Sequence, residues 1–160
     1  MTRIVLDAEA VNALVQSDHP AERTVRRAME AAHRLRRDVA VATVTLAELY
    51  RGAGRSRALD AVLAREAPDG LFMRNTDRDL ARLVGALLAE TDLGSDRLAD
   101  AHAVAVAVEA GGGVVLTGDP EELARLAGPY RTVVVEPLSG ADGPSRRRRR
   151  RGAGQEHGPS

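Results

Sequence analysis

The chain alternates between short, continuous apolar runs and longer stretches in which apolar residues recur every three or four positions. The first pattern is typical of buried strands and the second of amphipathic helices. The predicted strands are residues 3–6, 39–42, 70–74, 114–117 and 131–136. The predicted helices are residues 8–16, 21–37, 46–52, 56–66, 77–90, 97–110 and 120–127, with Thr43 as a helix cap. This alternation predicts an α/β fold in which helices flank a mostly parallel central sheet.

The pattern stops after residue 138, which predicts one folded domain over residues 1–138 and a tail over residues 139–160. The tail is rich in Gly, Pro and Arg and includes six consecutive arginines at 146–151, so we expect it to be disordered. The formal net charge of zero hides this division. Residues 1–145 hold 17 arginines against 22 Asp and Glu, whereas residues 146–160 hold six arginines against Glu156 alone.

The composition excludes several chemistries. There is no cysteine, which excludes disulfides, thiolate metal sites and cysteine nucleophiles. All 23 basic residues are arginine, so a P-loop lysine and a Schiff-base amine are also excluded. Two Tyr, one Phe and no Trp make base stacking an improbable mode of recognition. No apolar run reaches the roughly 18 residues of a membrane helix, and Asp7 comes too early for a signal peptide, so we expect a cytoplasmic protein without membrane contact.

Four carboxylates occupy positions that suggest a site. Asp7 and Asp119 follow predicted strands, and ligands of parallel α/β sheets bind beyond the carboxyl ends of strands. Glu48 follows the second strand, and Asp100 lies one turn into a helix among apolar neighbours, where a charge needs a cation nearby. Each residue also has a simpler interpretation: Asp7 and Asp119 as helix caps, Glu48 as a solvated helix residue. Asp96 could share the site or cap the helix.

Oxygen ligands without cysteine or clustered histidine favour a hard cation, Mg²⁺ or Mn²⁺. Such ions activate water and stabilise the leaving oxygen in phosphodiester hydrolysis. The four histidines are scattered along the chain, and His102 points away from Asp100 on a helix, so a zinc site is not expected.

At these carboxylates the sequence resembles the PIN-domain family, and VapC-type toxins in particular. The matching segments run in the same order over residues 3–137: Ile4-Val5-Leu6-Asp7; residues 42–49 (ATVTLAEL) followed by Arg51-Gly52; residues 96–105 (DRLADAHAVA); and residues 114–123 (VVLTGDPEEL). The resemblance implies a PIN-like, Rossmann-like domain. It also implies an endoribonuclease that serves as the toxin of a type II toxin–antitoxin pair, with a VapB-type antitoxin and homodimerisation.

The resemblance further implies that Asp7, Glu48, Asp100 and Asp119 are the catalytic, Mg²⁺-binding residues, with Mn²⁺ as a substitute ion. Thr117 and Asp96 are expected to support them. Arg51 and Arg97, and nearby Arg55 and Arg57, are candidates for contacts with RNA phosphates, and the alternative for each is an ordinary surface arginine. Two positions depart from the family pattern: Glu9 stands where Ser, Asn or a small residue is common, and Gly118 where Ser, Arg or Asn is common.

Two alternatives stay open at this stage. The chain could be a catalytically weak or inactive PIN-like interaction module, or a PIN nuclease of RNA maturation rather than a toxin. Four mutually repelling carboxylates have no evident purpose in an inactive module, which favours the enzyme. The sequence does not identify the RNA, the bond that is cut, the antitoxin, the number of metal ions or the role of residues 146–151.

Overall fold

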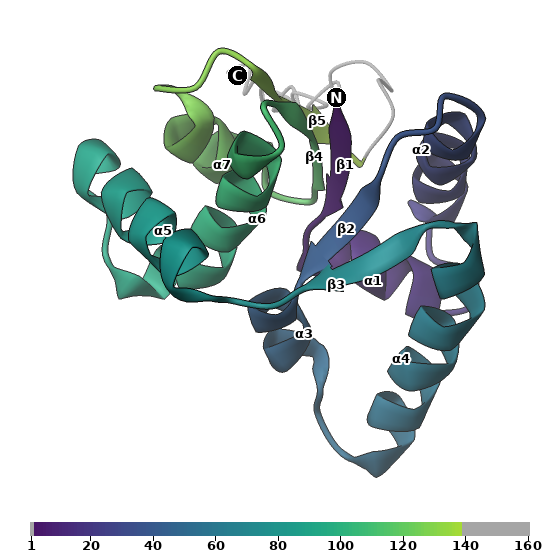
Figure 1. Cartoon of the computed structure of the whole chain (residues 1–160). Helices are drawn as coiled ribbons and strands as arrows, with labels where there is room; N and C mark the ends of the chain where they lie inside the picture. Colours follow the sequence, from purple (N-terminus) through teal and green to yellow (C-terminus); the bar gives the residue numbers. More distant parts are fainter. Residues whose placement is uncertain (1, 139–160) are drawn as a thin grey trace, which may run out of the picture.

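A computed structural model describes residues 2–138, and the predicted tail at 139–160 lies outside the described residues. The core is a five-stranded sheet in the order β3-β2-β1-β4-β5 (Figure 1). Its strands are β1 (Arg3–Leu6), β2 (Val39–Ala42), β3 (Leu71–Arg74), β4 (Gly113–Thr117) and β5 (Val133–Pro137). Every pairing is parallel, so the predicted mostly parallel α/β sheet is confirmed.

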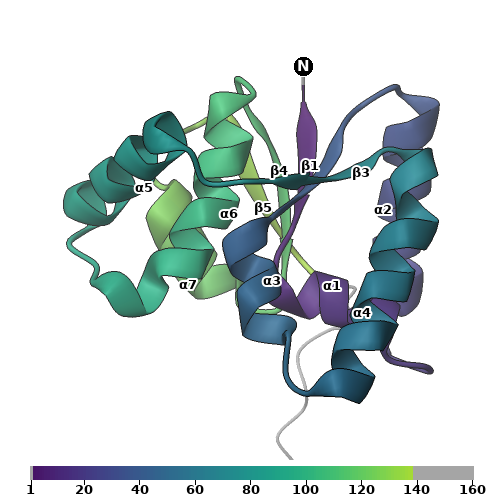
Figure 2. The ribbon, with the colours of Figure 1, turned by 60° about the horizontal axis from the view of Figure 1, so that its bottom comes forward.

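Seven α-helices cover the sheet: α1 (Ala8–Val15), α2 (Glu22–Arg34), α3 (Thr43–Leu49), α4 (Ala53–Glu66), α5 (Arg78–Thr91), α6 (Leu98–Glu109) and α7 (Pro120–Ala127). In Figures 1 and 2, α5, α6 and α7 lie together on one side of the sheet and α1, α2 and α4 on the other. Alternate residues of β1 enter the two layers. Leu6 packs with α1, α2 and α4, and Val5 packs with α5, α6 and α7.

The helix that carries Glu48 begins differently from the prediction. Thr43 was predicted as a cap, but the N-cap residue is Ala42, and Thr43 is the first residue of α3. Strand β2 passes directly into the helix, so the Thr43 hydroxyl donates instead to the carbonyl oxygen of Arg74 on β3, at 3.5 Å. Helix α3 ends at Leu49 rather than at residue 52. Gly52, at φ +81°, is the N-cap of α4.

The strand order explains where a site can form. From β1 the chain builds outward through β2 and β3, then returns to place β4 on the other side of β1. The carboxyl ends of β1 and β4 are in register, with Leu6 opposite Leu116, and this is the point at which parallel α/β sheets bind ligands. Within residues 2–138, no helix combines the length and apolar character that crossing a membrane requires.

Candidate active site

Asp7 follows β1 and is fixed by the backbone around it. Its side chain is the N-cap of α1, where one carboxylate oxygen accepts from the backbone N–H of Ala10 at 2.8 Å. The other oxygen accepts from the backbone N–H of Gly118, at 3.1 Å, which joins β1 to the end of β4. Asp7 is only 8% exposed. Burial raises its pKa, while hydrogen bonds from Thr117, Ala10 and Gly118 oppose that rise.

Asp119 stands at the matching position after β4. It is the N-cap of α7, and its side chain accepts weakly from the backbone N–H of Glu122, at 3.5 Å. Its own backbone N–H donates to the hydroxyl of Thr117, a fully buried residue, at 2.9 Å. Thr117 therefore links the two acidic residues, and its role as a supporting residue of a metal site stays a prediction. Capping, the simpler interpretation, is correct for Asp7 and Asp119, but it leaves the exposed Asp119 carboxylate largely free for other partners.

Asp100 connects the remaining acids to this pair. It is the third residue of α6, and its side chain is 29% exposed. Burial is the main cause that raises its pKa. The charge of Glu48 raises it further, Arg97 lowers it, and Asp7 and Asp119 raise it. Only nearby charges shift a pKa in this way. The four carboxylates, which follow β1, lie on α3 and α6, and precede α7, are therefore close enough to interact electrostatically.

Arg97 is the basic residue that the structure places near Asp100. Its guanidinium lies 3.8 Å from a carboxylate oxygen of Asp100, and 3.5 Å from oxygens of both Asp96 and Glu122. Arg97, not Asp96, is the residue that precedes α6, so the predicted capping role of Asp96 is wrong. Asp96 lies in a 3-10 turn (Ser95–Arg97) with its side chain 76% exposed.

Glu122 was missed in the sequence analysis. Its side chain is 23% exposed and forms an ion pair with Arg97, which also pairs with Asp100. The spacing of Asp119 and Glu122 resembles a capping box, but the Asp119 N–H donates to Thr117 instead, and the Glu122 carboxylate faces Arg97, so no sequence signal indicated this position.

The donor set suits a hard divalent cation, since every candidate ligand is a carboxylate oxygen. His102 cannot add a nitrogen ligand: it is buried, and its Nδ1 lies 2.7 Å from the carbonyl oxygen of Leu98, within its own helix. Within residues 2–138, no three His, Asp or Glu side chains already lie at the spacing that encloses an ion. The four carboxylates therefore lie in the same region of the structure but do not form a closed coordination sphere. We name Asp7, Glu48, Asp100 and Asp119 the acidic site.

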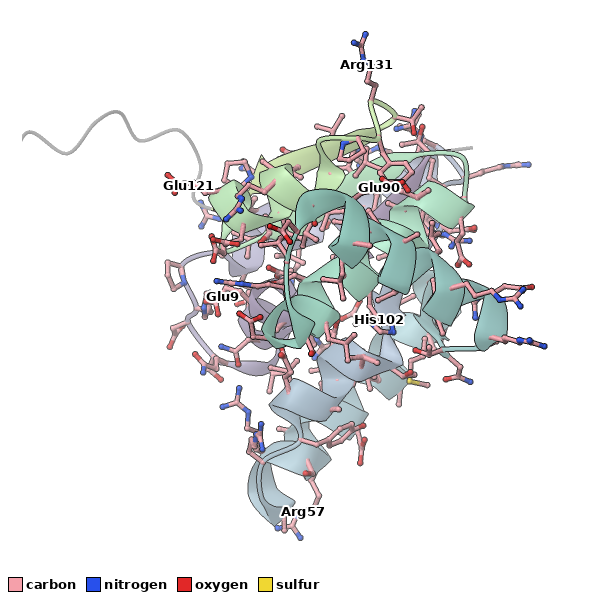
Figure 3. The ribbon with its side chains drawn as sticks, turned by 90° about the vertical axis from the view of Figure 1, so that its left-hand side faces the viewer. Glu9, Arg57, Glu90, His102, Glu121 and Arg131 are labelled. Carbon is pink, nitrogen blue, oxygen red and sulfur yellow. The ribbon has the colours of Figure 1, made fainter. Side chains whose placement is uncertain are left out.

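Apart from Arg97, the predicted RNA-contacting arginines lie around α3 and α4. Arg51 donates to the backbone carbonyl of Glu48 at 3.2 Å, which places it beside the acidic site. Arg55 donates to the side chain of Asn12 at 2.8 Å. Arg57 lies in the protruding end of α4, at the bottom of Figure 3, well away from Glu9 beside the acidic site. All three side chains are exposed, and contact with phosphate stays a prediction for them.

A separate cavity of about 340 Å³ lies on the other side of the sheet and is lined by α2 and the end of α4. Its buried acid, Glu66, already receives hydrogen bonds from Arg26, at 3.3 Å, and from Arg65, at 2.9 Å. None of the four carboxylates of the acidic site lines it. We interpret Glu66 as a satisfied structural residue.

Comparisons with known proteins agree with this geometry. Residues 4–129 match the family model of the PIN domain. VapBC2 from Rickettsia felis, solved with a DNA fragment from its promoter, is similar over 85% of this chain and 98% of that chain, at 17% identity and a TM-score of 0.59. A toxin–antitoxin complex from Klebsiella pneumoniae is similar over 82% of this chain and 95% of that chain, at 21% identity and a TM-score of 0.55.

A search among curated proteins gave no significant match. At these identities the two solved structures show a shared fold. The family model spans most of the described chain and includes all four carboxylates of the acidic site. The chain therefore belongs to the PIN domain family.

Proposed function

We propose that this protein is a Mg²⁺-dependent endoribonuclease that acts as the toxin of a type II toxin–antitoxin system. One observation carries the proposal: carboxylates from four separate elements converge, and three of them raise the pKa of the fourth, Asp100. PIN domains are nucleases that generally use divalent metals, which agrees with a cluster of oxygen donors. The fold shared with two toxin–antitoxin complexes supports the toxin role over RNA maturation.

In this proposal the four carboxylates hold Mg²⁺, or Mn²⁺ in its place. The bound ion would supply an activated water and stabilise charge on the leaving oxygen. Asp7 is the anchored ligand, because the backbone on both sides of it fixes its direction. Thr117 keeps the Asp119 backbone in place, and Arg97 partly neutralises Asp100 when no divalent ion is bound.

RNA recognition is proposed to rest on shape and backbone contacts, since the chain has few aromatic residues. Arg51, adjacent to Glu48, is well placed to contact a phosphate near the acidic site. Arg97 is a less direct candidate, because three carboxylates already surround its guanidinium.

A VapB-type antitoxin is the proposed inhibitor, the protein is proposed to form homodimers, and it is proposed to act in the cytoplasm. Arg97 illustrates how inhibition could work: the carboxylates of this region accept a guanidinium as a counter-ion. We expect the antitoxin to cover the acidic site and to place an arginine against Asp7 and Asp119. A structure of the complex with both carboxylates open to solvent would refute that mode.

The proposal is tested by combining cation binding with cleavage. Wild type should gain thermal stability from Mn²⁺ or Mg²⁺, because an ion that binds only the folded state stabilises it. Asp100→Asn should lose both that gain and the cleavage of RNA, whereas Glu121→Gln, a change at an exposed α7 carboxylate, should keep both. An inactive interaction module would show no cation-dependent gain in wild type.

A further inference from the structure

The two departures from the family pattern, Glu9 and Gly118, meet in space. A Cβ atom added to Gly118 would lie 2.7 Å from Cγ and 2.9 Å from Cβ of Glu9, closer than carbon atoms approach one another. The backbone of Gly118 does not have a positive φ, so its conformation does not require glycine. The requirement is one of space: the Glu9 side chain occupies the volume that a side chain at 118 would fill.

His19 holds Glu9 in this position. The Nδ1 atom of His19 accepts from the backbone N–H of Ala21 at 3.1 Å, so a neutral ring carries its proton on Nε2. Nε2 lies 2.9 Å from Oε1 of Glu9 and donates to it. The side chain of His19 is only 11% exposed, whereas that of Glu9 is 49% exposed. A buried ring thus fixes one end of a carboxylate whose remaining surface faces solvent.

The aliphatic part of Glu9 therefore lies against the edge of the acidic site. The residue that it covers, Gly118, donates its N–H to Asp7 and immediately precedes Asp119. Figure 3 labels Glu9 between α7 and α3, the helices that begin at Asp119 and carry Glu48.

We propose that Glu9 is a fifth carboxylate of the acidic site, a positioning residue that draws a divalent cation toward Asp7 and Asp119, and that Gly118 is glycine to admit it. This inference rests on the proposed function. Glu9 acts through its negative charge at the edge of the acidic site. Its side chain occupies the space that a side chain at position 118 would otherwise fill. A carboxylate near a bound ion lowers the dissociation constant, and removal of such supporting groups commonly weakens metal binding about tenfold or more.

The test is Mn²⁺ affinity measured by isothermal titration calorimetry on the full chain. Glu9→Gln keeps the size of the side chain and the bond from His19 but removes the charge, so the dissociation constant should rise about tenfold. Glu121→Gln is the matched control: it removes a carboxylate from the first turn of α7, at a side chain that Figure 3 labels at the edge of the molecule, and should leave affinity unchanged. Asp100→Asn should abolish binding.

A second pair of variants tests the role of Gly118. Gly118→Ala should displace Glu9 and weaken Mn²⁺ binding about as much as Glu9→Gln does. In a Glu9→Gly background both carbon atoms that crowd position 118, the Cβ and Cγ of Glu9, are absent, so Gly118→Ala should have no further effect. If Gly118→Ala prevents folding, Glu9→Gln alone decides the role of the charge.

The outcomes separate this inference from the proposed function. If wild type binds no Mn²⁺, the proposed function fails, and this inference fails with it. If wild type binds Mn²⁺, Asp100→Asn does not, and Glu9→Gln matches wild type, then the inference is wrong while the proposed function stands. A Gly118→Ala effect that persists without Glu9 overturns the explanation of the glycine.

Discussion

Asp7 and Glu48 are both candidate metal ligands, but the fold holds them in opposite ways. Asp7 is 8% exposed, caps α1 and bridges two parallel strands through the N–H of Gly118. Glu48 is exposed on α3, and within the described residues its carboxylate makes no hydrogen bond or ion pair. The Asp7 carboxylate makes hydrogen bonds that support the fold, whereas the Glu48 carboxylate is available to bind a ligand. Activity should depend on both, whereas stability should depend on Asp7 alone.

The largest expected effect is on activity and should be shared by the two residues. Asp7→Ala and Glu48→Ala should each reduce Mg²⁺-dependent RNA cleavage by about 100-fold or more, because each removes a ligand of the proposed ion. The measurement is the rate of cleavage of a defined RNA by purified protein, with Glu121→Ala as the control. Near-wild-type cleavage by Glu48→Ala would remove Glu48 from the site.

The free energy of unfolding should distinguish Asp7 from Glu48. Asp7→Ala removes a helix cap, which costs about 1 kcal/mol, and leaves the N–H of Gly118 without its acceptor, which costs about 1–3 kcal/mol. Glu48→Ala should change the free energy of unfolding by less than about 0.5 kcal/mol. Urea denaturation without metal measures both. Equal losses would show that Asp7 is no more structural than Glu48.

Asparagine at position 7 sharpens the same point. Asp7→Asn keeps the acceptor for Ala10 but turns an amide NH₂ toward the N–H of Gly118, so two donors face each other. Asp100→Asn meets no such conflict, since the structure gives that carboxylate only the Arg97 ion pair. Both changes remove a buried charge, so we expect Asp7→Asn to be folded and inactive but less stable than Asp100→Asn. An Asp7→Asn variant as stable as Asp100→Asn would contradict the assigned bonds.

Asp100→Asn should stabilise the metal-free protein. The folded-state pKa of Asp100 is raised above its ordinary value of 3.8, mainly by burial, so the folded protein holds that proton more tightly than the unfolded chain does. The free energy of unfolding therefore falls as pH rises from about 3.8 through the raised pKa. At neutral pH, Asp100→Asn should therefore raise the Tm of the metal-free protein.

Calorimetry across pH, with metal removed by a chelator, measures this effect. The advantage of Asp100→Asn should shrink as the pH falls through the raised pKa of Asp100 and should be absent below about pH 3.8, where the wild-type carboxyl is protonated in both states. An advantage that is constant with pH would have a cause other than charge.

The smallest expected effect concerns the arginine-rich end of the chain. Deletion of residues 141–160 should leave Tm and the bond that is cut unchanged, because the four carboxylates and all five strands lie before it. At most, RNA binding should become weaker and less dependent on salt, since each phosphate neutralised on a single strand contributes about −0.7 to the log–log salt slope. Loss of folding would show that these residues belong to the domain.

The sequence was sufficient for the fold because each β-strand is a short apolar run bounded by helical periodicity. The ends of elements were less predictable. The second helix was predicted to reach residue 37, but it ends at Arg34, and Arg36 takes a positive φ of 52° that no pattern of apolar residues reveals. Thr43 was predicted as a helix cap because the spacing of apolar residues does not show that β2 passes directly into α3 without a loop.

Within the site, local patterns identified single carboxylates but not their partners. Asp7 and Asp119 could be named because strand ends are visible in sequence. The pairing of Glu9 with His19, ten residues apart across a loop, had no such signal. The crowding of Gly118 by Glu9 depends on the register of β1 with β4, which only the folded sheet establishes.

The central claim is that Asp7, Glu48, Asp100 and Asp119 hold a divalent cation. Anomalous diffraction from crystals of the protein soaked in Mn²⁺ tests it most directly. The account predicts a peak beyond the carboxyl ends of β1 and β4, within about 2.0–2.3 Å of carboxylate oxygens that include those of Asp7 and Asp100. The peak should be absent in Asp100→Asn crystals. A Mn²⁺ peak elsewhere, with these four carboxylates free of metal in well-ordered density, would contradict the account.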